Sequence, residues 1–146
     1  MGSVMAKSYL TLLALLGLLM TSPLEAATRL PVDTPSTVGD LEAVCTGVGL
    51  DSRQNPDWTV YPLKIEVAGQ GGQYLGDTTL TLSQDGKELA AVKCDGPWIL
   101  FRIPPGRYQL QAETEGKTIQ SPAFVPTGGQ GRIILRFPEL GGRTSH

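Results

Sequence analysis

The sequence predicts an all-β fold, a seven- or eight-stranded antiparallel β-sandwich. Apolar and polar residues alternate in short runs, for example over 63–67 and 108–112, which is the pattern of strands with one buried face. Turn-forming residues separate these runs at hairpin spacing, and no stretch after residue 27 repeats with the period of a helix. Short, evenly spaced strands of this kind are typical of a sandwich or a small barrel.

The patterned strands follow one another along the chain. In order they span 61–69, 77–83, 88–94, 98–103, 107–112, 118–125 and 132–137, and 41–47 makes an eighth if it pairs. In the first of them Leu63, Ile65 and Val67 point to one face. Lys64 and Glu66 point to the other face, so this strand has one apolar and one charged side.

The next two runs predict a hairpin. Leu80 and Leu82 point inward from the run 77–83. The segment 84–87 contains Asp-Gly, which readily adopts the positive φ that a tight hairpin turn needs. The run 88–94 then returns antiparallel to its predecessor.

The turn at 104–106, Pro-Pro-Gly, joins the two runs with the clearest alternation. The inward residues expected of this core hairpin are Ile99, Phe101, Ile103, Tyr108, Leu110 and Ala112. The run 118–125 contains a proline, which suits an edge strand because proline has no N–H for the ladder. In the run 132–137, Ile133, Leu135 and Phe137 point inward, and we expect Phe124 in the core as well.

The two ends of the chain differ in composition from the patterned part. Residues 1–27 have the plan of a secretory signal peptide, with a positive residue, a short apolar run and small residues at Ala26 and Ala27. That run is shorter than the ~20 residues of a membrane span. We therefore expect export to the periplasm and no membrane span after cleavage, with a retained anchor as the alternative. Residues 28–40 predict a flexible leader, 41–138 the sandwich domain and 139–146 a flexible tail.

Cysteine usage predicts a disulfide. The chain has two cysteines, Cys45 and Cys94. In an exported protein the compartment is oxidising, so the two are expected to pair. A reactive thiol or a metal pair is the alternative.

Composition excludes several classes of function. The net charge of −2 and the lack of a basic tract argue against a nucleic-acid partner. The one histidine, His146, is the last residue, which argues against a Ser-His-Asp or Cys-His site and against a zinc site. We expect no enzymatic activity, no cofactor and no bound metal.

Carboxylates in loops leave one catalytic alternative, because a pair of acids can hydrolyse a glycoside without histidine. The loop acids are Asp51, Asp57, Asp77, Asp85 and Asp95. Each has Gly, Pro or Ser close by, so turn formation explains them more simply.

A few aromatic residues outside the expected core are candidates for binding. Trp58, Tyr61 and Tyr74 lie in or near predicted loops, and Trp98 begins a strand that also carries Arg102. Together they predict a patch for a protein or a sugar. For Trp98 alone, burial against the disulfide is the competing interpretation.

Two stretches resemble a known family. They are DTTLTLSQDGKELA at 77–90 and ILFRIPPGRYQLQAE at 99–113. The second stretch carries the ending that is typical of the family, here Pro104, Pro105, Gly106, Tyr108, Leu110 and Ala112. They resemble the carboxypeptidase regulatory-like domains, which are transthyretin-like sandwiches, over residues 60–137. The resemblance implies a prealbumin-like fold and a non-catalytic role.

We therefore expect a non-catalytic periplasmic interaction module that binds a protein or a cell-envelope partner. The alternatives are a carbohydrate-binding module that uses Trp58 and Trp98, an inhibitor of an envelope-attacking enzyme, and a hydrolase that uses loop carboxylates.

Overall fold

The structure is a computed structural model that describes residues 26–140. The predicted signal peptide lies outside the described residues apart from its last two positions, as does the predicted tail from residue 141. None of the helices in the described range is long and apolar enough to cross a membrane.

Strands dominate the described residues. They are β1 (Thr28–Arg29), β2 (Ser36–Val38), β3 (Leu41–Thr46), β4 (Leu63–Gly69), β5 (Thr78–Gln84), β6 (Lys87–Cys94), β7 (Trp98–Arg102), β8 (Gly106–Thr114), β9 (Lys117–Val125) and β10 (Gly131–Phe137). Between β3 and β4 lie the short helix α1 (Leu50–Arg53) and the 3-10 helix η2 (Pro56–Val60).

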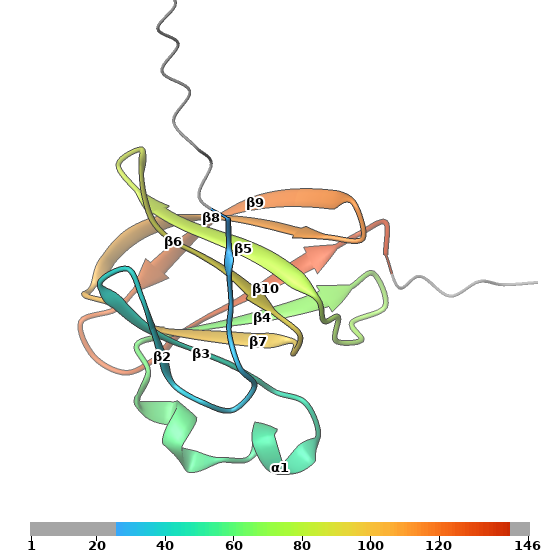
Figure 1. Cartoon of the computed structure of the whole chain (residues 1–146), viewed down its shortest axis with the longest axis horizontal. Helices are drawn as coiled ribbons and strands as arrows, with labels where there is room; N and C mark the ends of the chain where they lie inside the picture. Colours follow the sequence, from blue (N-terminus) through green and yellow to red (C-terminus); the bar gives the residue numbers. More distant parts are fainter. Residues whose placement is uncertain (1–25, 141–146) are drawn as a thin grey trace, which may run out of the picture.

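The strands form two five-stranded sheets that pack against each other (Figure 1). Sheet A has the order β1-β6-β5-β8-β9, and sheet B has the order β10-β4-β7-β3-β2. The prediction of an all-β sandwich is therefore confirmed.

Two finer parts of that prediction are wrong. The described residues contain ten strands rather than seven or eight, and both sheets are mixed rather than antiparallel. β10 runs parallel to β4 and β1 runs parallel to β6. The reason for β10 is its connection, because the chain leaves β9 in sheet A and crosses to the edge of sheet B before β10 begins.

Residues 28–40 are not a flexible leader in the structure, which corrects that prediction. They form β1 on β6 and the hairpin strand β2 on β3. Leu30 is fully buried, and its N–H donates to Lys93 O at 2.9 Å. One or two apolar residues suffice to anchor such short strands, so the segment carries no alternation that would predict them.

The core lies between the sheets and is built from the inward residues of the predicted strands. Phe101 and Phe137 are the largest fully buried side chains, and Ile65, Leu82 and Ile99 are fully buried with them. The alternation therefore predicted the buried face of these strands correctly. Ile133 is half-buried and packs at the margin of this core.

The predicted Cys45–Cys94 disulfide is present, and it joins the two sheets. Both residues are buried, with β3 of sheet B on one side and the end of β6 of sheet A on the other. The turn after Cys94 packs closely on β3, because a Cβ at Gly96 would lie 2.5 Å from Thr46 O. This close approach explains the glycine in the sequence Cys-Asp-Gly-Pro-Trp.

Candidate functional site

All five predicted partner-binding residues lie on or over the outer face of sheet B. On β7, Trp98 and Arg102 alternate with the inward residues Ile99 and Phe101. The five residues form two groups, one of Trp58, Tyr61 and Arg102 and one of Tyr74 and Trp98. The structure thus does not bring them together as one patch.

The first group is a second, smaller core. Trp58 and Tyr61 pack on Val44 and Leu100, and their exposed fractions are 7% and 3%. The Tyr61 hydroxyl donates to the Glu42 carboxylate. Burial, followed by this hydrogen bond, raises the pKa of Tyr61 to about 12. Neither ring offers a free face on which a sugar could stack.

A cavity of about 420 Å³ lies beside this small core. Its lining residues are Asp33, Pro35, Asn55, Pro56, Asp57, Trp58, Val60, Tyr61 and Arg102. Asp33 already accepts hydrogen bonds from the hydroxyls of Thr46 at 2.5 Å and Ser52 at 2.8 Å. The Asn55 side chain caps η2 by accepting from Asp57 N at 2.9 Å. These polar groups therefore stabilise the connection between β3 and β4, and their hydrogen bonds are made within the protein.

The second group surrounds Trp98, which is 6% exposed. Lys64 Nζ lies 3.6 Å from the centre of the Trp98 ring, and Tyr74 contacts that ring edge-on at 6.2 Å between centroids. Arg53 in turn lies over Tyr74, 5.3 Å from the centre of its ring. Trp98 is thus buried beneath Lys64 and Tyr74, which leaves its indole closed to a partner.

Glu66 is a buried carboxylate at the centre of this charged face. Arg132 donates to it from Nε at 2.6 Å and from Nη2 at 3.0 Å, and Lys64 Nζ lies 3.3 Å away. Burial alone would raise its pKa, but the Arg132 hydrogen bonds and the Lys64 charge outweigh burial and hold the pKa of Glu66 below its ordinary value. Two cations therefore share one carboxylate.

This lowered pKa predicts a stability that depends on pH. Because Glu66 binds its proton less tightly in the folded chain, its contribution is present above the ordinary pKa of 4.5 and is lost as the pH falls through the lowered folded pKa. We expect Glu66→Gln to unfold about 2 kcal/mol more easily than the parent at pH 7. At pH 3 the difference should be much smaller. Urea unfolding at both pH values measures it.

A matched control for this experiment is Glu139→Gln, which removes an exposed carboxylate paired with Lys117. That change should have little effect at either pH, because exposed ion pairs are screened by solvent. An equal loss for Glu66→Gln at pH 7 and pH 3 would show that shape rather than charge accounts for the role of Glu66.

The five loop acids lie in three places: Asp51 and Asp57 in the connection between β3 and β4, Asp77 and Asp95 at one end of the β5–β6 pair, and Asp85 in the β5–β6 turn. Asp77 and Asp85 adopt φ angles of 56° and 52°, which fits the turn-forming role expected of them. Asp95 binds the Arg29 guanidinium. Among residues 26–140, no three His, Cys, Asp or Glu side chains are grouped so that they could hold a metal ion.

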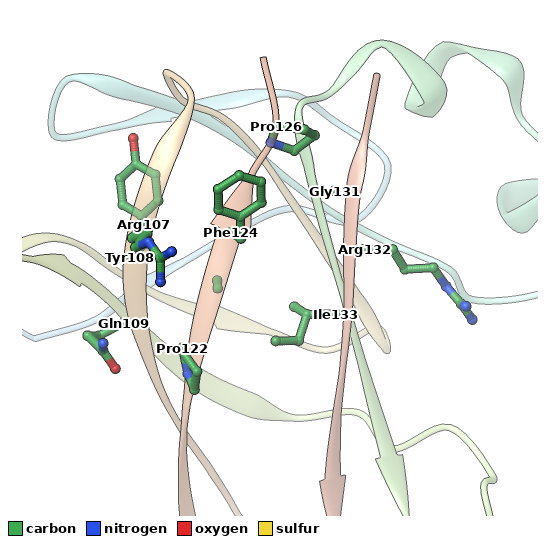
Figure 2. A pocket seen from close by; sticks show the side chains of 10 residues that line it. Arg107, Tyr108, Gln109, Pro122, Phe124, Pro126, Gly131, Arg132 and Ile133 are labelled. Atoms are coloured by element: carbon green, nitrogen blue, oxygen red, sulfur yellow. The ribbon is translucent and has the colours of Figure 1, made fainter. Parts of the chain in front are cut away.

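A groove that sequence reasoning missed lies between the β8–β9 hairpin and β10 (Figure 2). Its volume is about 560 Å³, and its lining residues are Arg107, Tyr108, Gln109, Pro122, Ala123, Phe124, Pro126, Gly131, Arg132 and Ile133. Figure 2 shows Pro122 and Phe124 on β9 and the Ile133 side chain reaching toward them from β10. The groove is therefore apolar at its centre.

Phe124 corrects the prediction that it belongs to the core. Its exposed fraction is 61%, whereas its neighbours Ala123 and Val125 are buried. The strand alternates, so only one of the two sets can point inward. The small residues fill the interior here and the aromatic ring faces solvent, a choice that the short run PAFV does not reveal.

The groove is closed at one end by a close backbone approach. A Cβ at Gly131 would lie 2.6 Å from Phe124 O, so a glycine lets β10 begin directly beside the end of β9. Despite this contact, no backbone hydrogen bond joins β9 to β10 within the described range. Both strands therefore end their sheets without a partner on this side of the sandwich.

Arginines lie on the strands that flank the groove. Arg107 is the cross-strand neighbour of Phe124, and neither Arg107 nor Arg136 forms an ion pair in the part of the chain that the structure describes. Arg132 shares its carboxylate with Lys64. Among the described residues, β8 and β10 therefore each carry an arginine that forms no ion pair.

No protein-family model matches the chain, and no curated protein matches it.

Proposed function

We propose that the protein is a non-catalytic interaction module that binds another protein at the groove between β9 and β10. The observation that carries this proposal is the 61% exposure of Phe124 in that groove. Large aromatic side chains exposed beside an apolar cleft are typical of binding sites, because their burial by a partner provides most of the binding free energy.

A protein partner fits this surface better than a sugar does. Sugar-binding modules present open aromatic faces, but Trp58 and Trp98 are buried. The groove instead combines apolar side chains with two unpaired strand edges, and both features are used in binding extended peptide segments. An inhibitor of an envelope-attacking enzyme is one form that such a module could take.

We place this binding in the periplasm after cleavage of residues 1–27. The signal-like composition of that segment and the buried Cys45–Cys94 disulfide both support an oxidising compartment.

We also propose that the sandwich is a prealbumin-like relative of the carboxypeptidase regulatory-like domains. The support is the motif around residues 104–112, where the Tyr108 hydroxyl donates to Pro104 O at 2.7 Å and fixes the core hairpin. Domains of this kind serve mostly as non-catalytic modules, which agrees with the proposed role.

Photo-crosslinking in living cells tests the proposed binding surface. A benzoyl-phenylalanine replaces Phe124 in the full chain, and matched variants carry the same probe at Lys87 or at Tyr74. Lys87 is exposed on the β5–β6 hairpin, and Tyr74 is 41% exposed on the outer face of sheet B. We expect a protein adduct from position 124 alone. Identical adducts from all three positions, or none from position 124, would contradict the proposal.

A further inference from the structure

β10 presents an unpaired row of backbone groups. Within residues 26–140 it pairs only with β4, toward which Gly131 N donates to Pro62 O at 2.7 Å. Successive residues of a strand direct their N–H and C=O to opposite sides. The backbone groups of Arg132, Ile134 and Arg136 therefore point away from β4, and no backbone hydrogen bond joins them to another strand within residues 26–140.

The neighbouring edge of β9 is protected, whereas that of β10 is not. β9 follows a two-residue turn that pairs Lys117 with Thr114, so the backbone groups of Pro122 face away from β8. A proline at such a position removes the donor that a partner strand would need. β10 has no proline, and its pairing with β4 has no register shift, so it remains competent to accept a strand.

The side chains of β10 indicate the chemistry of the partner. Arg132, Ile134 and Arg136 share the outer face of sheet B, where Ile134 is 40% exposed. Arg136 has no ion pair in the described range, and Arg132 is only partly neutralised by Glu66. A strand laid against β10 would place its own side chains directly opposite these residues, where opposite charges stabilise the pair.

A second copy of this chain fits the edge poorly. The symmetric pairing of two β10 strands that makes the most hydrogen bonds is centred on Ile134. It sets Arg132 opposite Arg136 of the other copy, and like charges in that position are destabilising. The edge therefore selects against itself and for an acidic segment.

We propose that the occupant is an extended segment of a partner protein that adds a strand to β10, with acidic residues opposite Arg132 and Arg136. The side chains on the other face of that segment point toward β9 and are apolar, because they meet Ile133 and the groove that holds Phe124. This inference rests on the proposed function and names the class of partner segment that the groove binds.

A synthetic peptide tests the proposal directly. The blocked heptapeptide Thr-Glu-Val-Thr-Val-Glu-Thr reads the same in both directions, so its glutamates face the two arginines in either strand orientation. We expect it to bind the full chain at about 50 mM salt and to protect the amides of Arg132, Ile134 and Arg136 from hydrogen exchange. The amides of Thr79, Thr81 and Ser83, within sheet A, should be unaffected.

Matched peptides separate charge from strand pairing. Replacing both glutamates by glutamine should weaken binding about tenfold, as should raising the salt to about 500 mM. N-methylation of alternate amides tests the backbone, because one alternate set faces β10 and the other faces solvent. One set should abolish binding and the other should have little effect.

Variants of the protein provide the reciprocal test. Ile134→Pro removes an outward N–H without touching the β4 ladder, and Ile134→Thr keeps that N–H as its control. We expect loss of binding for the first and retention for the second. Arg136→Glu should weaken binding of the glutamate peptide about tenfold, and it should favour a peptide in which one of the two glutamates is replaced by lysine.

The outcomes distinguish this inference from the proposed function. Absence of peptide binding, binding without protection of the β10 amides, or binding that is insensitive to N-methylation would each overturn strand addition at β10. If the position-124 probe still captures a protein in cells, the groove remains a binding surface and only its occupant is wrong. If that probe captures nothing, the proposed function itself fails.

Discussion

Loss of the disulfide should be the most damaging change in this fold. We expect the double variant Cys45→Ala/Cys94→Ala to unfold with a free energy about 4 kcal/mol lower than that of the oxidised parent, because the bond closes a loop with a sequence separation of 49. That free energy corresponds to the conformational entropy that the crosslink removes from the unfolded chain. It is a large part of the free energy of unfolding of a typical domain, which is roughly 5–15 kcal/mol.

Denaturant unfolding of the oxidised parent and the double variant measures the effect. Thiol alkylation under denaturing, non-reducing conditions is the control, and it should leave both cysteines of the parent isolated from cells unlabelled. Two labelled thiols would show that the bond does not form in the cell, and a difference below about 1 kcal/mol would show that the unfolded chain is not the state it constrains.

Trp58→Ala should be a stability defect rather than a binding defect. The residue is only 7% exposed, and its side chain packs on Val44, Leu100 and Tyr61. Truncation of a buried tryptophan leaves a cavity that the surroundings fill only partly, and we expect a loss of about 3 kcal/mol in the free energy of unfolding. Because η2 has no other buried residue, its 3-10 helix should detach from sheet B.

Val60→Ala is the matched control for this prediction. Val60 lies in the same short helix and lines the same cavity, but it is 60% exposed. Its truncation should change stability by less than about 0.5 kcal/mol. If Trp58→Ala instead left stability intact and abolished retention on an envelope polysaccharide, carbohydrate binding would replace the interaction module as the explanation of Trp58.

The fold was predictable from sequence where a strand has one buried face. The runs 63–67 and 108–112 alternate because each packs one face on the core. The apolar residues of that face are buried as expected: Leu63, Ile65, Val67, Tyr108, Leu110 and Ala112. The disulfide was predictable because only two cysteines were available. The short strands β1 and β2 were not, because a strand of two or three residues has no period to detect.

The binding surface could be predicted less well, for a physical reason. Aromatic residues in loops suggest contact with a partner. Trp58 and Tyr61 instead pack on two apolar residues of the outer face of sheet B, Val44 and Leu100. An apolar outer face can be recognised from the sequence only after each strand has been assigned to its sheet. The exposure of Phe124 depends in the same way on which residues of β9 point inward.

The pairing of β10 with β4 also determines how the chain can fold. The hairpins β5–β6 and β8–β9 join neighbours in sequence, but Arg132 and Glu66 meet across 66 residues of chain. Pairs so distant form only after a large loop has closed, so they raise the contact order and slow folding. Until β10 arrives, β4 is itself an open edge and Leu135 and Phe137 are missing from the core. A nascent chain that has not yet delivered β10 is therefore the form most exposed to aggregation, and it is the form that a chaperone would have to protect.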